Sequence, residues 1–204
     1  ADYICLYKNE EVPAFESVVA KIPLPWIIKP CNAGRSYGVH KVETKEQYTE
    51  AVKDAFQYDG RGKCLIEKAI EGFEIGCAVM GNDELVTGSC DEIEITRGVF
   101  DFEGKYDLVG SNIYCPARID KDTFDHAQTL AKRVYRALNC TGMARVDMFV
   151  QPDHSIVLNE VNTIPGFTAT SRYPSMMAEA GISFPTPPPP PPPPPPPTPP
   201  PPSP

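Results

Sequence analysis

The 204 residues include 27 acidic and 19 basic side chains, which gives a formal net charge of −8 and a pI near 4.9. This acidic balance argues against broad electrostatic attraction to nucleic acid or anionic lipid. No apolar run approaches the roughly 20 residues that cross a bilayer, and no basic-then-apolar signal pattern opens the chain. We therefore expect a cytoplasmic protein that binds neither nucleic acid nor membrane.

Short strands alternating with one helix are predicted for the first part of the chain. The strands are expected at the opening ADYICLYK and at residues 25–30, 39–42 and 64–67. Thr44 and Gln47 fit a capping box, so a helix should run from there to about Phe56. Its predicted inward residues are Tyr48, Ala51, Val52 and Ala55.

A second set of strands and one long helix are predicted for the rest. Strands are expected at residues 74–80, 85–87, 92–96, 144–150 and 156–161, with a turn at 151–154. The helix spans 123–138, with Leu130, Val134, Ala137 and Leu138 facing inward. Residues 98–112 form a long irregular segment, which in a compact domain is usually functional or disordered. The predicted fold class is α+β, with helices on a largely antiparallel sheet.

Seven cysteines lie singly along the chain, without a CxxC pair or a Cys/His cluster of zinc spacing. An odd number argues against a complete disulfide framework. We expect reduced, mostly buried thiols and no metal site built from sulfur.

The end of the chain is a proline tract, which holds seventeen of the twenty-five prolines from Phe184 onward. Such a tract is typical of an exposed polyproline II rod. It is either a ligand for SH3, WW or profilin-type grooves or a low-complexity repeat without a partner. We predict subdomains at 1–80 and 81–184, followed by a disordered tail at 185–204.

A lysine followed by a glycine-containing loop is the first feature that suggests chemistry. Lys29 ends an apolar strand, and Gly34, Ser36 and Gly38 follow it. Backbone amides approach a phosphate closely where no Cβ intervenes, which favours a phosphate site. The alternative is an ordinary turn with a surface lysine.

Two neighbouring strands hold the second feature. Arg145 and Asp147 share one face of their strand, and Glu160 and Asn162 share one face of the next. If a hairpin joins the strands, two carboxylates and an amide oxygen meet on one surface, which suits Mg²⁺. The alternative is a surface Arg–Asp pair beside a polar strand end.

A charged segment forms the third feature. Glu67, Lys68 and Glu74 lie at or just beyond an apolar strand end, where acidic groups suit adenine and ribose and a lysine suits phosphate. On these residues alone, a solvated charged turn is the favoured interpretation.

The order of these motifs resembles the D-alanine–D-alanine ligase family. The matching segments, over roughly residues 1 to 184, are WIIKP, the glycine loop, LIEK with EGFE, EGKY, ARVDMF and NEVNTIPGFTATSRYP. The ending SRYP is similar to the vancomycin-resistance branch, whose second substrate is D-serine or D-lactate. The resemblance implies an ATP-grasp fold with central and catalytic subdomains. It also implies a chain that is shortened at both ends and lacks the family's N-terminal domain.

The resemblance implies a nucleotide site for ATP. Lys29 and Lys68 would contact the phosphates and the adenine edge, while Glu67 would lie beside adenine and Glu74 would bind ribose. Lys105, on a lid at residues 98–112, would reach the γ-phosphate.

The resemblance also implies metal and catalytic roles. Asp147, Glu160 and Asn162 would hold two Mg²⁺ ions, with Mn²⁺ as an alternative metal. Arg145 would stabilise an oxyanion, and Ser171, near Gly166, would fix the carboxylate of the second amino acid. Tyr106 would help close the active site.

The phosphate loop departs from the family pattern, because Gly34-Arg35-Ser36 replaces a Gly-Ser-Ser run. Ser36 is kept as a catalytic candidate. Arg35 stands where a serine would link the lid tyrosine to the N-terminal domain, and it would either bind phosphate or obstruct closure.

The implied function is ATP-dependent ligation of D-alanine to D-alanine or D-serine through an acyl phosphate, for peptidoglycan precursors. Tyr106 favours an amine nucleophile and therefore a dipeptide product. Further partner candidates are a second copy in a homodimer and a polyproline-binding domain. The alternative from another class is a non-catalytic ATP- and Mg²⁺-binding remnant. A glutathione-synthetase-like ligase is disfavoured by the segment NTIPGFTATS.

Overall fold

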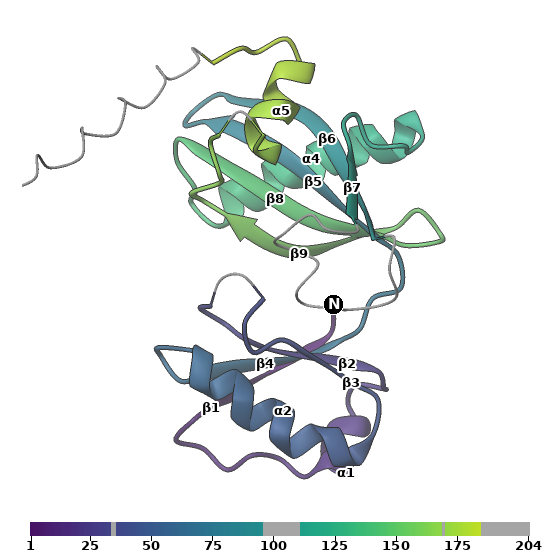
Figure 1. The fold of residues 1–204 in the computed structure, drawn as a ribbon, viewed down its shortest axis with the longest axis vertical. Helices are drawn as coiled ribbons and strands as arrows, with labels where there is room; N and C mark the ends of the chain where they lie inside the picture. Colours follow the sequence, from purple (N-terminus) through teal and green to yellow (C-terminus); the bar gives the residue numbers. More distant parts are fainter. Residues whose placement is uncertain (34–35, 96–110, 169, 185–204) are drawn as a thin grey trace, which may run out of the picture.

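The computed structural model describes residues 1–33, 36–95, 111–168 and 170–184, and these residues form two β-sheets (Figure 1). The first sheet has the strand order β1-β4-β2-β3, and the second has the order β7-β6-β5-β8-β9. Every strand pairing in the described residues is antiparallel. The predicted α+β class is therefore confirmed.

The first sheet is covered by helices on one face (Figure 1). Its elements are β1 (Tyr3–Tyr7), α1 (Phe15–Val19), β2 (Trp26–Pro30), β3 (His40–Val42), α2 (Lys45–Tyr58) and β4 (Lys63–Lys68). Trp26, Ile28 and Ile66 are fully buried beneath the helices. Because side chains alternate along a strand, Lys29 and Glu67 project from the opposite face.

The start of α2 is built as the sequence predicts. Gln47 accepts a hydrogen bond from the backbone N–H of Thr44 at 3.1 Å and completes a capping box. The four residues predicted to face inward are all buried, namely Tyr48, Ala51, Val52 and Ala55.

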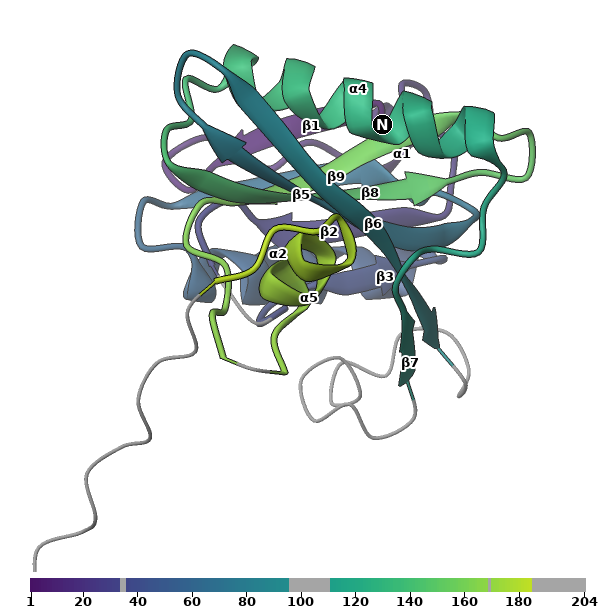
Figure 2. The same ribbon diagram turned by 90° about the horizontal axis from the view of Figure 1, so that it is seen from above.

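The second sheet is covered on both faces by helices. Its elements are β5 (Phe73–Gly81), β6 (Leu85–Ile95), β7 (Ser111–Tyr114), α4 (Lys121–Ala137), β8 (Met143–Val150), β9 (Ile156–Asn162) and α5 (Arg172–Glu179). Figure 2 shows α4 and α5 on opposite sides of this sheet. Cys77 and Val79 pack in the cluster beneath α4, whereas Ala78 packs with Tyr173 and Met176 of α5.

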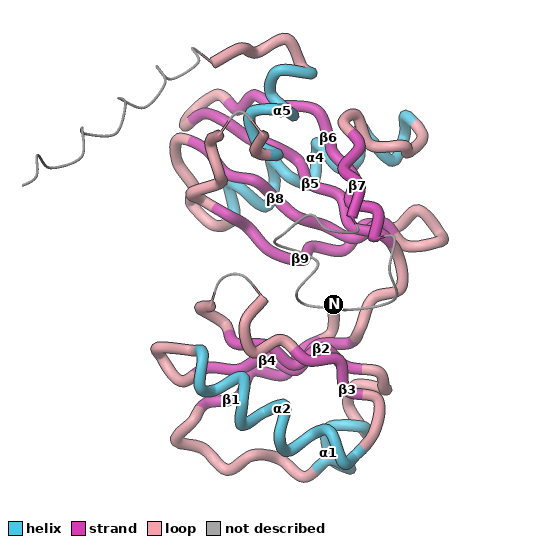
Figure 3. The backbone as a smooth tube through the Cα atoms, viewed as in Figure 1, coloured by secondary structure: helices cyan, strands magenta, loops and turns pink. Residues whose placement is uncertain are grey.

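Several predicted boundaries differ from the structure. The strands expected at 85–87 and 92–96 form one continuous strand, β6, and α1, β7 and α5 were not predicted (Figure 3). The last two residues of the predicted lid, 111–112, belong to β7, while residues 96–110 lie outside the described part of the chain. α4 ends at Ala137, so the predicted inward positions Ala137 and Leu138 are exposed, and Tyr135 is buried instead.

The chain passes from the first sheet to the second through residues 69–72. The boundary predicted after residue 80 falls inside β5, which belongs wholly to the second sheet. Gly72, with φ at 149°, lies in this crossing, where Val150 O would stand 2.2 Å from an added Cβ. The division into subdomains and the character of residues 185–204 stay predictions.

All seven cysteines are free thiols, of which Cys64, Cys77 and Cys90 are buried and the other four are half-buried. Among the helices that the structure describes, none is long and apolar enough to cross a membrane.

Candidate functional site

Polar side chains gather on the face of the second sheet that bears α5. Val146 and Met148 of β8 are buried in the cluster beneath α4, so Arg145 and Asp147 project from the other face. Across the β8–β9 ladder, Asp147 lies opposite Glu160 and Arg145 lies opposite Asn162. The structure therefore brings together the four side chains that the sequence placed on one surface.

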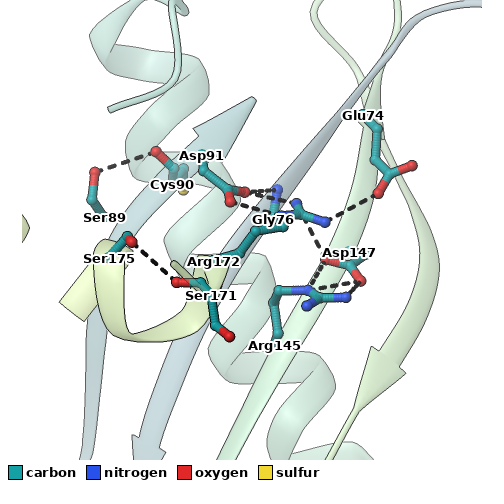
Figure 4. Close-up of polar contacts among 10 residues, drawn as sticks. All are labelled: Glu74, Gly76, Ser89, Cys90, Asp91, Arg145, Asp147, Ser171, Arg172 and Ser175. Atoms are coloured by element: carbon teal, nitrogen blue, oxygen red, sulfur yellow. Dashed lines mark hydrogen bonds and ion pairs between the residues drawn. The ribbon is translucent and has the colours of Figure 1, made fainter. Parts of the chain in front are cut away.

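Asp147 is a buried carboxylate, with a side chain only 1% exposed. Arg145 Nε donates to its two oxygens at 2.7 and 3.0 Å, and Arg145 Nη2 donates to Oδ2 at 2.8 Å (Figure 4). A bidentate arginine of this kind offsets the cost of burying the charge. The predicted Arg–Asp pair exists, but it is buried rather than on the surface.

Sequence reasoning did not identify Arg172 and Asp91, which lie next to this pair (Figure 4). Arg172 Nε and Nη2 donate to the two oxygens of Asp91 at 2.7 Å each. The same guanidinium lies 3.4 Å from Glu74 Oε1 and 3.6 Å from Asp147 Oδ1. No spacing rule links residues 81 positions apart, and Asp91, a lone aspartate between two predicted strands, gave no signal of burial.

Glu160 is accessible to solvent but is surrounded by charged groups. The pKa of its carboxyl is raised above its ordinary value, first because surrounding protein atoms partly desolvate it. The negative charges of Asp147 and Glu74 raise this pKa further, while Lys29 and Arg145 act in the opposite direction. These five side chains thus share one electrostatic neighbourhood, which draws on both sheets.

Lys29 links the two sheets. Its Nζ lies 2.7 Å from Glu67 Oε2 on the neighbouring strand β4 and donates to Asn159 Oδ1 of β9 at 3.5 Å. Figure 1 shows β9 as the strand of the second sheet that lies nearest the first sheet. Lys68 is exposed, and strand alternation directs it away from Glu67, so the structure does not bring Lys68 together with Lys29.

The loop after β2 is fastened at its base by the buried carboxylate of Asp59. Asp59 Oδ2 accepts from the backbone N–H and the side chain of Asn32, at 2.7 and 3.0 Å. Asp59 Oδ1 accepts from the backbone N–H groups of Arg61 and Lys63, at 2.8 and 3.1 Å. Ser36 has a left-handed φ of 55°, and residues 34–35, including Arg35, lie outside the described residues.

The Asp59→Ala variant should lose about 2 kcal/mol of unfolding free energy, because it leaves several part-buried donors without their acceptor. Burial opposes the charged form of Asp59, but hydrogen bonds from Lys63, Arg61 and Asn32 outweigh it and lower its pKa. A lowered carboxyl pKa contributes stability that is present at neutral pH and is lost below about pH 4, as the pH falls through the folded-state value.

Urea unfolding of the parent and of Asp59→Ala from pH 7 to pH 2.5 measures this contribution. The stability difference between them should shrink at acidic pH. A difference that stays constant across that range would contradict the assigned role of the carboxylate.

Ser171 stands at the N-terminus of α5, in a turn with Gly166 and Thr168. Its hydroxyl accepts from Thr168 N–H at 3.0 Å and lies 2.8 Å from Thr168 Oγ1. A Cβ added to Gly166 would come within 2.9 Å of Ser171 Oγ. The structure therefore places Gly166 beside Ser171, and the start of a helix favours an anionic group.

The oxygen-bearing side chains of β8 and β9 have the chemistry of ligands for a hard metal ion. Among the described residues, no three His, Cys, Asp or Glu side chains lie together as a metal cluster, so the set comprises two carboxylates and the amide of Asn162. Asn162 Oδ1 accepts from Ile164 N–H at 3.1 Å, which fixes the amide orientation. A hard divalent cation fits this oxygen set.

Two predicted residues, Lys105 and Tyr106, lie outside the residues that the structure describes. Their roles, like those of the other candidates, stay predictions.

Comparison with known proteins shows which family this chain matches. The family described as "D-ala D-ala ligase C-terminus" matches residues 1–186. The chain is 46% identical to D-alanine–D-alanine ligase of Oceanobacillus iheyensis, covering 86% of this chain and 48% of the relative. It is 49% identical to the vancomycin B-type resistance protein VanB of Enterococcus faecalis, covering 79% and 48%.

A solved structure agrees with these matches. The VanG D-Ala:D-Ser ligase from Enterococcus faecalis superposes with a TM-score of 0.80 at 46% identity, covering 89% of this chain and 52% of that chain. The chain spans about half the length of these relatives. It belongs to the D-alanine–D-alanine ligase family, in the part that the C-terminal family description covers, and its fold is ATP-grasp.

Proposed function

We propose that this chain forms the nucleotide-binding and catalytic part of an ATP-dependent ligase that joins D-alanine to a second D-amino acid. The observation that supports it most is the pairing of Asp147 with Glu160 across β8 and β9, beside the point where Lys29 of the first sheet reaches Asn159 of β9. Such a group of one cation and two carboxylates suits a magnesium-bound polyphosphate. Family membership supports the reaction type.

The proposed reaction has two steps. A carboxylate oxygen of the first amino acid attacks the γ-phosphorus of ATP, forming an acyl phosphate and releasing ADP. The amine of the second amino acid then attacks the acyl carbon, phosphate leaves, and the amine loses a proton. The product is a dipeptide for peptidoglycan precursor synthesis.

Two Mg²⁺ ions would be held by three side chains, namely Asp147, Glu160 and Asn162. Mn²⁺ is an alternative metal. The metal would supply positive charge to the transferring phosphoryl group. The orientation of these ligands is set by the protein, since Arg145 holds Asp147 and the Ile164 N–H holds Asn162.

The nucleotide would lie between the two sheets. Lys29 offers its ammonium to the phosphates from the open face of the first sheet, and Glu67 orients it at 2.7 Å. Glu74, on the second sheet, would bind the ribose. Lys68 and Lys105 would contact the phosphates or the adenine edge.

Arg145 is proposed to stabilise the negative charge that develops on the acyl oxygen in the second step. Gly166 and Ser171 would receive the carboxylate of the second amino acid at the start of α5, where backbone N–H groups and the helix dipole favour an anion. Ser36 would face the phosphates, and Tyr106 would close the site. D-alanine and D-serine both stay candidates for the second substrate.

We propose a cytoplasmic protein whose substrates are ATP and D-amino acids, with a homodimer and a polyproline-binding partner as further candidates. The tail at residues 185–204 would serve as the ligand for that partner.

The Lys29→Met variant should bind ATP about 30-fold more weakly than the parent, because a charged hydrogen bond to phosphate contributes about 2 kcal/mol. Titration of a fluorescent ATP analogue measures the change. The matched control is Lys21→Met, which removes an exposed lysine near the first sheet and should leave binding unchanged. Equal affinities for all three proteins would show that Lys29 does not contact the phosphates.

The function is tested by phosphate release from MgATP in the presence of D-alanine, with and without D-serine, while mass spectrometry follows dipeptide. Dipeptide formed in step with phosphate would establish the ligase activity in this chain and identify the second substrate. Nucleotide binding without turnover would favour the non-catalytic alternative.

A further inference from the structure

Arg172 is a nearly buried arginine that contacts carboxylates from three strands. Its side chain is 12% exposed, and it forms a two-point pair with Asp91 of β6, whose side chain is 1% exposed. Glu74 of β5 and Asp147 of β8 lie 3.4 and 3.6 Å away. Charges this deep are costly unless they are paired, so each member of the cluster depends on the others.

The backbone of β5 is adapted to the Arg172–Asp91 pair. Gly76 N–H donates to Asp91 Oδ1 at 3.0 Å. A Cβ on Gly76 would lie 2.5 Å from Arg172 Nη2 and 2.7 Å from Asp91 Oδ1. The pair therefore occupies the space that any larger side chain would need.

Arg172 connects the buried charged cluster to the start of α5. Arg172 is the first residue of α5 and directly follows Ser171. The rest of α5 is held by apolar packing of Tyr173, Met176 and Met177, all fully buried. The turn before the helix is packed less completely, since Ile164 is 88% exposed and Phe167, although its ring contacts those of Tyr173 and Phe184, is 41% exposed.

We propose that Arg172 is a positioning residue: anchored by Asp91, it fixes Ser171 relative to Asp147. The roles of Ser171 in binding the second amino acid and of Asp147 in binding metal rest on the proposed function. The contacts of Arg172 with Asp91 and Asp147, which we call the clamp, do not depend on those roles. The planar guanidinium of Arg172 reaches Asp91 at two points and Asp147 at a third, which a lysine cannot reproduce.

Arg172 lies closer to Asp91 than to Asp147. The guanidinium approaches Asp91 at 2.7 Å and Asp147 at 3.6 Å. Asp91 therefore takes up most of the charge of Arg172, while the main partner of Asp147 is Arg145, at 2.7 Å.

The test variant is the double substitution D91N with R172Q. Either change alone leaves a buried charge without its partner and lowers stability, whereas the double change removes both charges together. The side-chain amide introduced at position 91 keeps an acceptor for Gly76 N–H, and its NH₂ group meets the carbonyl introduced at position 172. The second variant is Arg172→Lys, which keeps the charge on Asp91 but loses the third contact. Tyr173→Phe is the matched control, because it removes a buried hydrogen bond of α5 to Val79 O without touching the carboxylates.

Two measurements are made on the 204-residue chain. The first is amide hydrogen exchange by NMR at Thr168 and Ser171, whose N–H groups bond within the turn. We expect roughly tenfold faster exchange at these amides in D91N/R172Q and in R172K, at unchanged global stability in the double variant. The second is the affinity for a fluorescent ATP analogue with Mg²⁺ and with EDTA. The gain from Mg²⁺ should fall about tenfold in the same two variants but not in Y173F.

Each outcome decides the proposal. Exchange at Thr168 and Ser171 that matches the parent in both variants would overturn the clamp, as would faster exchange in Y173F of equal size. Full recovery of the Mg²⁺ effect in the double variant would show that the pair is only structural. A parent chain that binds no nucleotide would refute the proposed function, and the exchange data would still decide the clamp.

Discussion

Nucleotide binding by the Asp147→Asn variant is expected to lose its dependence on Mg²⁺, with the affinity for MgATP falling by at least about 100-fold. An amide keeps the size of the side chain and one acceptor oxygen but removes the charge that binds a divalent cation. Arg145 would still stand beside the position while one of the two proposed metal-binding charges would be gone, so the attraction for Mg²⁺ would be strongly weakened. Titration of a fluorescent ATP analogue, with Mg²⁺ and with EDTA, measures the difference.

Glu160→Gln tests the same site from the neighbouring strand, and we expect a loss of similar size. The control is Asp153→Asn, an exposed carboxylate in the turn that joins β8 and β9, which should leave the Mg²⁺ effect intact. Binding with EDTA should be little changed in all three variants, which separates a lost metal ligand from a damaged fold. An undiminished Mg²⁺ effect in both Asp147→Asn and Glu160→Gln would rule out the metal assignment.

The site on β8 and β9 could be predicted because its geometry is local. Strand alternation fixes which residues share a face, and a short turn fixes which residues lie opposite each other. Asp147 accordingly lies opposite Glu160, and Arg145 lies opposite Asn162. Strand alternation alone therefore predicted which of these side chains share a surface, without any knowledge of the rest of the fold. The roles given to individual side chains came from the family resemblance and stay proposals.

The Arg172–Asp91 pair could not be predicted because it depends on the packing of α5 against the sheet. The same packing explains the error in β6, which was predicted as two strands around Gly88. Gly88 lies in the gap between the two predicted strands, and glycine is depleted in strands. In the structure, an added Cβ at Gly88 would lie 2.9 Å from Met176 O and from Met177 Sδ. The glycine is required by the helix that covers the strand, and no local pattern reports that requirement.

Gly76→Ala should destabilise the chain by about 3 kcal/mol or more. The added Cβ would stand 2.5 Å from Arg172 Nη2, 2.7 Å from Asp91 Oδ1 and 3.0 Å from Asp147 Oδ1. Arg172 could yield only by losing a contact with Asp91, and both carboxylates belong to buried strand residues. Overpacking would therefore be added to the cost of separating buried charges. Urea unfolding monitored by Trp26 fluorescence measures the loss.

Gly60→Ala is the matched control, because no atom lies within 4 Å of its added Cβ. Its expected change lies between zero and a gain of about 1 kcal/mol, through the reduced entropy of the unfolded chain. If Gly76→Ala were as stable as Gly60→Ala, the guanidinium and its carboxylates would have to move apart without cost. That result would be incompatible with a rigid cluster beneath the proposed metal site. A large loss confined to Gly76→Ala would instead show that the close approach of the three charged groups is itself a requirement of the fold.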